Sequence, residues 1–335
     1  MSSPDFLRGR IAFDPGSRAD ELEPIPWPKG LAPTPGRPAS HEDTDPLPAA
    51  TVLIVTYTAA EGRALADILT PGLTSTLWSA YTKDWATYEP LLGEHAPARD
   101  SKRLGSWCVT RIGEKSVVCF KSELHPATDG PELPILKLWP QLIREANPDL
   151  VITTGTAGGV GQGTQLGDVA VASVVMWDCT EQFGDEKWAH DSFPTSPLTS
   201  KMATALNGTG LLMAVNEGKI PGQYRKRAAK IWSPPETTVT TDFFAMGDTT
   251  DNFGLLKLAP DCRAVEMDDA ALGMALKSLA HSPAFFSIRN ASDPVMPGDQ
   301  PISEQEKAAE AIYEKYGYFT TVNSAIACWA IVSAL

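Results

Sequence analysis

The chain has 335 residues, and 43% of them are hydrophobic, enough for one large or two ordinary domains around a well-buried core. Its formal net charge of -13 excludes a nucleic-acid backbone or an anionic membrane as a partner, because both would repel it. The five cysteines form no Cys-x-x-Cys pair and the five histidines are far apart, so the sequence predicts a reduced, cytoplasmic protein with no metal or other cofactor.

The first segment, residues 1–48, contains ten of the 28 prolines. Proline removes a hydrogen-bond donor and fixes φ, so we expect an extended arm without regular helix or strand. The segment has no apolar region typical of a secretory signal. One interpretation is a disordered leader. The other is an arm that lies along its own domain or a neighbouring subunit, because it carries apolar residues such as Phe6, Ile11 and Trp27.

Residues 49–335 are expected to form one α/β domain, because strand patterns alternate with helix patterns throughout. Residues 72–104 interrupt this order; they are rich in aromatic residues and contain two prolines, which indicates an insertion that acts as a lid or an oligomer contact. The elements expected before residue 148 are a strand at 51–56, a helix at 61–69, a hairpin at 106–120 and a helix at 133–146.

The central stretch runs from Pro148 to Ser173. It begins with a buried strand at 150–154, and a turn of small residues, 155–159, is expected directly after it. Such a turn lets the backbone approach a ligand closely, and ligands of open α/β sheets lie at the carboxyl ends of strands. Without a ligand, the same residues would form an ordinary tight turn. A second β-rich run follows at 169–176.

The C-terminal half continues the alternation after an irregular region that ends near residue 197. The basic run 224–227 is interpreted as the solvated face of a helix, as expected on so acidic a protein. The helices expected here span 199–216, 221–231, 268–280, 303–316 and 320–334, and the strands span 237–241, 264–266 and 284–289.

Three acidic residues follow expected strands: Glu61, Asp268 and Asp293. Acids in this position are candidates for proton transfer or for recognition of a hydroxyl group. Each also has a structural interpretation, because an acid can cap a helix, and Asp293 precedes Pro294 and could simply begin a turn.

Three segments resemble motifs of the superfamily of purine nucleoside phosphorylases and uridine phosphorylases. TTGTAGGVGQGTQLGDVAVAS is similar to the TGSAGG…GD(I/V)VV element of that superfamily. RAVEMDDAAL and FFSIRNASDP resemble AVEMEAAA and VVIRALSD of the branch with methylthioadenosine/S-adenosylhomocysteine nucleosidases. The motifs share order and spacing over residues 50–335, outside the insertion. The resemblance implies a three-layer α/β fold, in which helices flank a central mixed, twisted sheet.

The same resemblance implies the hydrolysis of the N-glycosidic bond of a purine nucleoside, the expected small-molecule partner. Asp293 would protonate N7 of the base and Glu61 would activate the attacking water. Phe243 or Phe244 would stack on the base, although either could be an ordinary core aromatic. The other implied substrate-binding residues are Thr156, Ala157 and Gly158 beside the nucleophile, and Glu266, Met267 and Asp268 at the ribose.

Four departures from the family pattern qualify this expectation. Asp268 is one methylene shorter than the family's hydroxyl-binding Glu, and VTYTAAE stands where nucleosidases carry GAMEEE. KSELHP replaces the family's KSGIGK, so His125 is either a site residue or the start of a helix. Thr153 occupies the place of the arginine found in many phosphorylases, which favours water over phosphate.

Two alternative functions stay open. Arg63 is the candidate phosphate ligand of a phosphate-dependent phosphorylase, although an exposed helix arginine is the simpler interpretation. The other alternative is a catalytically weak nucleoside-binding module. The family resemblance also implies a homo-oligomer, with a homodimer expected and a hexamer as the alternative.

Overall fold

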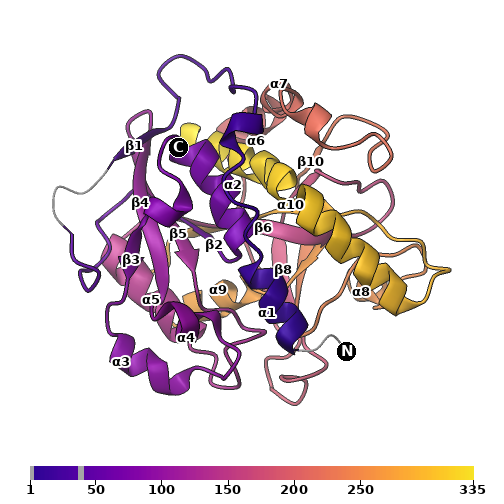
Figure 1. Ribbon diagram of the computed structural model, residues 1–335, viewed down its shortest axis with the longest axis horizontal. Helices are drawn as coiled ribbons and strands as arrows, with labels where there is room; N and C mark the ends of the chain where they lie inside the picture. The colour runs from indigo at the N-terminus through magenta and orange to yellow at the C-terminus, as the bar shows by residue number, and fades with distance from the viewer. Residues whose placement is uncertain (1–3, 37–40) are drawn as a thin grey trace.

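The computed structural model describes residues 4–36 and 41–335, and these form a three-layer α/β domain (Figure 1). Residues 1–3 and 37–40 of the expected arm lie outside the described residues. The helices are α1 (Pro4–Ala12), α2 (Ala59–Leu69), α3 (Trp85–Tyr88), α4 (Pro97–Ser101), α5 (Ile135–Ala146), α6 (Ser200–Asn207), α7 (Gly210–Ala214), α8 (Leu255–Leu258), α9 (Asp269–Leu276) and α10 (Ile302–Ser333). The strands are β1 (Thr34–Gly36), β2 (Val52–Thr56), β3 (Ser79–Tyr81), β4 (Gly105–Ile112), β5 (Lys115–Ser122), β6 (Leu150–Gly159), β7 (Val169–Val171), β8 (Val174–Asp178), β9 (Ser192–Pro194), β10 (Ile231–Trp232), β11 (Thr237–Thr241), β12 (Cys262–Glu266) and β13 (Ala284–Asp293).

The described part of the chain forms one mixed 13-stranded sheet with the main order β1-β4-β5-β2-β6-β12-β11-β8-β9. Strand β6 is its centre, because it pairs in parallel with both β2 and β13 and meets β12 antiparallel near its end. Since β2, β5, β6 and β13 run in parallel, their carboxyl ends lie at the same edge of the sheet. This edge is where such folds hold their ligands.

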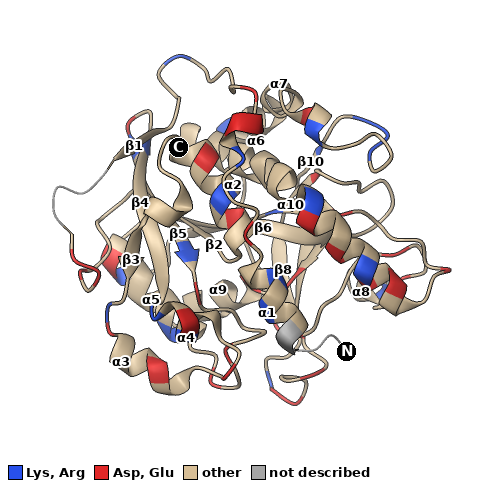
Figure 2. Cartoon of the chain, in the orientation of Figure 1, with Lys and Arg blue, Asp and Glu red and all other residues tan. Residues whose placement is uncertain are grey.

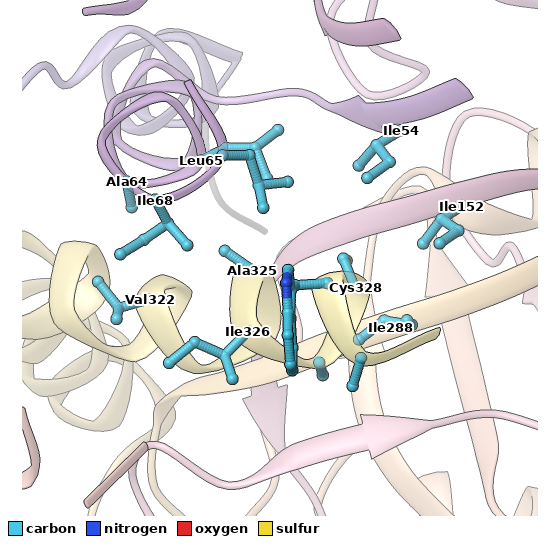
Figure 3. Close-up of a cluster of buried hydrophobic side chains, with 14 of the residues drawn as sticks. Ile54, Ala64, Leu65, Ile68, Ile152, Ile288, Val322, Ala325, Ile326 and Cys328 are labelled. Carbon is cyan, nitrogen blue, oxygen red and sulfur yellow. The ribbon is translucent and has the colours of Figure 1, made fainter. Parts of the chain in front are cut away.

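Alternation along the central strands builds a core on each face of the sheet. In β2, Val52 and Ile54 face the layer of α2, α6 and α10, whereas Leu53 and Val55 face α5 and α9. Figure 3 shows the first layer, where side chains of α2 and α10 pack against Ile54, Ile152 and Ile288. Strands buried on both faces carry continuous apolar runs, which explains why these strands were recognisable in the sequence. No helix in the described ranges combines the length and apolar character needed to cross a bilayer.

The expected strands at 51–56 and 237–241 and the hairpin at 106–120 are confirmed as β2, β11 and the β4–β5 pair. The insertion 72–104 carries β3, α3 and α4, and β3 pairs with β4. Its proposed role as a lid or an oligomer contact stays a prediction.

The glycine-rich turn expected after residue 154 is wrong, because β6 continues through Gly159. The reason is β13, which follows β6 in register to the pair of Asp293 and Gly158. The small residues therefore serve close approach to neighbouring groups within a strand, rather than a change of chain direction.

Helix predictions in the C-terminal half are also wrong at three places. The single helix expected at 199–216 is two short helices, α6 and α7, which are separated by Gly208 and Thr209. The helices expected at 303–316 and 320–334 form one 32-residue helix, α10. Gly317 lies between the two expected helices, but it does not interrupt α10. It makes room for the ring of Tyr313, because a Cβ at position 317 would lie 2.8 Å from Tyr313 Cδ2. The helix expected at 221–231, with a solvated basic face, is instead a loop over residues 221–230 that leads into β10 at Ile231. Its Arg227 pairs with the buried carboxylate of Asp168, and Lys226 N donates to Gln165 Oε1.

The arm is more regular than its prolines suggest. Pro4 lies at the start of α1, where a missing amide hydrogen costs no helix bond, and the prolines resume only at Pro15. The segment 34–36 adds β1 to the edge of the sheet beside β4. The described part of the arm therefore lies along its own domain. Helix α1 packs near α2 and α4 (Figure 1).

Candidate active site

A cavity lies at the sheet edge where the central strands end. Its polar walls include Glu61 from the first turn of α2, Thr156 from β6 and Asp268 at the N-cap of α9. The expected small residues Ala157 and Gly158 also line it, as does Met267. The complete lining is Leu7, Arg10, Ile11, Thr58, Glu61, His125, Thr156, Ala157, Gly158, Thr241, Phe244, Ala245, Val265, Glu266, Met267, Asp268 and Arg289.

Glu61 is held at the cavity as an ionised group. Its Oε1 accepts hydrogen bonds from the backbone and hydroxyl of Thr156 at 2.8 and 2.6 Å. Its Oε2 accepts from Thr56 Oγ1 and from the amides of Tyr57 and Thr58, which completes a capping box at the start of α2. Burial opposes ionisation, but the charge of Arg289 and these hydrogen bonds outweigh it and lower the pKa of Glu61.

Gly155 is required for this arrangement. A Cβ at position 155 would lie 2.5 Å from Cδ of Glu61, and the φ of Gly155 is 153°. Real Cβ atoms do not approach that closely, so any side chain here would displace the carboxylate. The absence of a side chain at Gly155 therefore allows the carboxylate of Glu61 to pack directly against β6.

Arg289 is the buried centre of the site's acidic groups. It extends from β13, forms a two-pronged ion pair with Asp269, and lies 2.9 Å from Glu266 Oε2. Its Nη1 donates to the carbonyl of Thr156 at 3.3 Å, which ties it to β6. Because Arg289 and its partners are buried, the arginine compensates negative charge that would otherwise be too costly to bury.

Asp268 and His125 contact each other in the wall of the cavity. His125 Nε2 lies 3.3 Å from Asp268 Oδ1, and both side chains are buried. Burial lowers the pKa of His125 to about 3, so the imidazole is neutral, whereas burial raises the pKa of Asp268 well above its ordinary value. His125 is thus a cavity residue and does not start a helix, since α5 begins at Ile135.

The carboxylate of Glu266 holds neighbouring parts of the site in place. Its carboxylate accepts hydrogen bonds from the amides of Asp268 and Asp269 at the start of α9, and from the hydroxyl of Thr240. Burial, together with the nearby charge of Asp269, raises the pKa of Glu266 to about 7. Anionic oxygens at a helix N-terminus satisfy amides that the helix leaves free, so Glu266 fixes the position of Asp268.

Asp293 ends β13 beside Gly158 of β6 and is 1% exposed. Its Oδ1 accepts a hydrogen bond from Ser292 at 3.2 Å and faces Nη2 of Arg10 at 3.5 Å, while its buried Oδ2 has no hydrogen-bond partner. Burial raises the pKa of Asp293 to about 6, although Arg10 opposes the shift. Asp293 does not itself line the cavity; Arg10, which does, lies against it.

The structure distinguishes between the two aromatic candidates. Phe244 lines the cavity, whereas Phe243 packs outside it against Phe253. Arg63, the candidate phosphate ligand, is also outside: it pairs with Asp14 at 2.6 Å and donates to Thr76. Within the described ranges, no group of three or more His, Cys, Asp or Glu side chains has the geometry of a metal site.

Among the cavity residues that sequence reasoning missed, the two charged ones are Arg289 and Arg10. An arginine inside the apolar run of β13 was a usable signal, because an unpaired charge is rarely placed in a central strand. Arg10 gave no comparable signal, since its position depends on the path of the arm. The structure brings Glu61, Asp268 and Phe244 to one cavity and places Asp293 at its edge, behind Arg10.

Comparisons with known proteins point to one family. The sequence pattern of the family described as "Phosphorylase superfamily" matches residues 140–323, more than half of the chain. A curated 5′-methylthioadenosine/S-adenosylhomocysteine nucleosidase from Actinobacillus succinogenes is 28% identical over 129 residues, which are 34% of this chain and 55% of that protein. A nucleosidase of the same name from Haemophilus influenzae is 37% identical over 62 residues, which are 18% of this chain and 27% of that protein. The chain thus matches about half the length of the first curated relative and less of the second.

Solved structures share the fold over most of the chain. The nucleosidase of Neisseria meningitidis in complex with methylthio-immucillin-A has a TM-score of 0.51 at 18% identity, and the match covers 85% of this chain and 99% of that one. The Helicobacter pylori nucleosidase with butyl-thio-DADMe-immucillin-A gives 0.53 at 13% identity, covering 86% and 99%. A futalosine hydrolase from the same organism gives 0.51 at 12% identity, covering 85% and 97%. At such identities the likeness shows a common fold.

Proposed function

Because this chain belongs to the phosphorylase superfamily, we propose that it is a nucleosidase that hydrolyses the N-glycosidic bond of a purine nucleoside. The supporting observation is the pair of carboxyl groups at the sheet edge whose pKa values are shifted in opposite directions: the pKa of Glu61 is lowered, whereas that of Asp293 is raised to about 6. Pairs of acids whose pKa values are pushed apart are typical of acid–base catalysis. The matched relatives are named as nucleosidases, which is consistent with this chemistry.

The proposal gives each of these groups a role. Cleavage of the bond develops positive charge on the sugar, so an acid must neutralise the leaving base while water attacks the opposite face. Protonated Asp293 gives its proton to N7 of the base, and Phe244 stacks on the ring. Asp268 accepts hydrogen bonds from the ribose hydroxyls, held in place by Glu266.

Thr156 connects the attacking water to Glu61. A carboxylate has about four lone-pair positions, and Glu61 already accepts five hydrogen bonds. A direct hydrogen bond from water would therefore have to displace a donor. The Thr156 hydroxyl lines the cavity and donates to Glu61 at 2.6 Å. It can accept the proton of water while passing its own proton to the carboxylate.

Replacing Thr156 by valine is expected to lower kcat by at least about tenfold, equivalent to ~1.4 kcal/mol of lost transition-state stabilisation. Valine keeps the shape of the side chain and removes the hydroxyl that touches Glu61. Thr156→Ser keeps the hydroxyl and serves as the matched control, with kcat expected close to that of the wild type. Equal kcat values for the valine and serine variants would contradict the relay. Steady-state kinetics of base release measures both.

The dependence of kcat/KM on pH should reflect the ionisation of Asp293. The acid works only while protonated, so kcat/KM should fall as pH rises through about 6, the raised pKa of this buried carboxyl. The fall should approach tenfold per pH unit on the alkaline side. Measurement of kcat/KM between about pH 5 and pH 8 checks this limb. A flat profile across that range would contradict the role of Asp293.

The test of the function is a release assay. Purified protein is incubated with adenosine, inosine and methylthioadenosine, with and without inorganic phosphate, and the free base is followed by chromatography. Release that does not depend on phosphate supports hydrolysis. Release only with phosphate identifies the alternative, a glycosyltransferase of the phosphorylase type. Binding without release identifies the nucleoside-binding module. The position of Arg63 outside the cavity does not favour phosphorolysis.

Assembly and location complete the proposal. We expect a homodimer, with a hexamer as the alternative, because the family resemblance implies subunit contacts near the sugar. Light scattering after size exclusion measures the oligomeric state. The five buried cysteines are compatible with the reducing cytoplasm.

A further inference from the structure

The base side of the cavity is filled by the chain's own amino-terminal arm. Leu7, Arg10 and Ile11 of α1 all line the cavity, and Leu7 packs with Phe244 and Met246. The space left has a volume of about 60 Å³, enough for a few water molecules at about 10–15 Å³ each. Sites that bind small molecules usually offer about 300–1,000 Å³. A nucleoside therefore cannot enter while α1 is docked.

Arg10 occupies the place that the proposed function gives to the base. Its guanidinium carbon lies 4.6 Å from the ring centroid of Phe244 and 4.0 Å from that of Tyr313. Its Nη2 lies 3.5 Å from Oδ1 of Asp293, and its Nη1 is buried without a hydrogen-bond partner. A flat cation on aromatic rings, facing a carboxyl group, resembles a protonated purine bound by the same groups.

The arm is fixed more firmly after α1 than within it. Asp14 forms a two-pronged ion pair with Arg63 at 2.8 and 2.6 Å, and Ser17 donates to Asp67. Helix α1 itself has nine residues, and isolated helices shorter than about 12–15 residues are marginal in water. The side chains of its ion pair between Arg8 and Asp100 are 39% and 63% exposed, and Figure 2 marks the charged residues along α1 and α4. The helix can therefore leave while residues 14–17 stay attached.

We propose that α1 is an exchangeable plug, in which Arg10 acts as an internal ligand of the base subsite and the docking of α1 and the binding of a purine exclude each other. This inference rests on the proposed function. If the open state is populated at 10% or less, the apparent affinity for a ligand is reduced at least about tenfold relative to the open protein. Weakening the plug should therefore strengthen binding.

The test compares full-length Arg10→Ala and wild type by calorimetric titration with adenine and by KM for the nucleoside that the release assay identifies. We expect Kd for adenine and KM each to fall about tenfold in Arg10→Ala. The double variant Leu7→Ala/Arg10→Ala should show at least the same fall. Arg18→Ala is the matched control, because Arg18 belongs to the same arm and stacks on Phe319, away from the cavity; its Kd and KM should equal those of the wild type.

Trypsin provides a readout independent of catalysis. Cleavage after Arg10 in the wild type should accelerate several-fold when adenine is added, because adenine displaces α1. Adenine binding that leaves cleavage after Arg10 unchanged would overturn the plug and leave the nucleosidase proposal standing. A rise of Kd and KM in Arg10→Ala would also overturn it, since Arg10 would then be a ligand of the substrate. If neither wild type nor Arg10→Ala binds adenine or releases a base, the nucleosidase proposal falls and the plug with it.

Discussion

Replacing Asp293 by asparagine is expected to lower kcat by ~10²- to 10⁴-fold, the range typical of a lost general acid. Asparagine has almost the same shape but carries no proton that it can give to a leaving base. The fold should be retained, because Oδ2 of Asp293 has no hydrogen-bond partner to lose and the change removes a buried carboxyl group. Steady-state kinetics and a thermal unfolding curve measure the two effects separately.

A substrate with a good leaving group sharpens this experiment. The nitrophenolate of a nitrophenyl riboside departs without protonation. Asp293→Asn should therefore cleave this substrate at nearly the wild-type rate while failing on purine nucleosides. Asp299→Asn is the control, because Asp299 is an exposed acid in the segment that follows. Equal losses on both substrates would show that Asp293 acts on the structure rather than on the leaving base.

Replacing Arg289 by methionine is expected to destabilise the protein by about 3–5 kcal/mol, the usual result of breaking a buried ion pair by removing one partner. Asp269 and Glu266 would stay buried without their countercharge. The loss would also raise the pKa of Glu61, because the charge of Arg289 helps to keep that carboxylate ionised. Activity should therefore fall together with the free energy of unfolding.

Urea denaturation of the wild type and Arg289→Met measures this loss. Arg111→Met is the matched control, since Arg111 lies on β4 and 58% of its side chain is exposed. This substitution should change the free energy of unfolding by less than about 0.5 kcal/mol. A change below 1 kcal/mol in Arg289→Met would mean that the buried acids rearrange or take up protons without the arginine.

The fold could be predicted where local pattern and tertiary environment agree. Strands β2 and β6 are buried on both faces, so their apolar runs stand out, and the hairpin turns at a glycine with positive φ, Gly113. Chain direction at residues 155–159 could not be predicted, because small residues suit a turn and a closely packed strand equally well. Only the pairing with β13 decides between them.

The site was predictable in part for a similar reason. Glu61 and Asp268 follow strands and Asp293 ends one, and parallel strands bring their carboxyl ends to one edge. The contact between Arg10 and Asp293 joins residues 283 positions apart and depends on the route of the arm. Proline content suggested an irregular arm, but prolines are absent between Pro4 and Pro15, which leaves room for α1.

The missing side chain at position 155 links two residues that are 94 positions apart in the sequence. An alanine there would collide with the carboxylate from α2, so the two sites should change together during evolution. Related proteins that have glycine at position 155 should also have the acid at position 61. Relatives with a bulkier residue at position 155 should lack both this acid and hydrolytic activity. Inspecting this pair in other genomes would separate active enzymes from members that have become receptors.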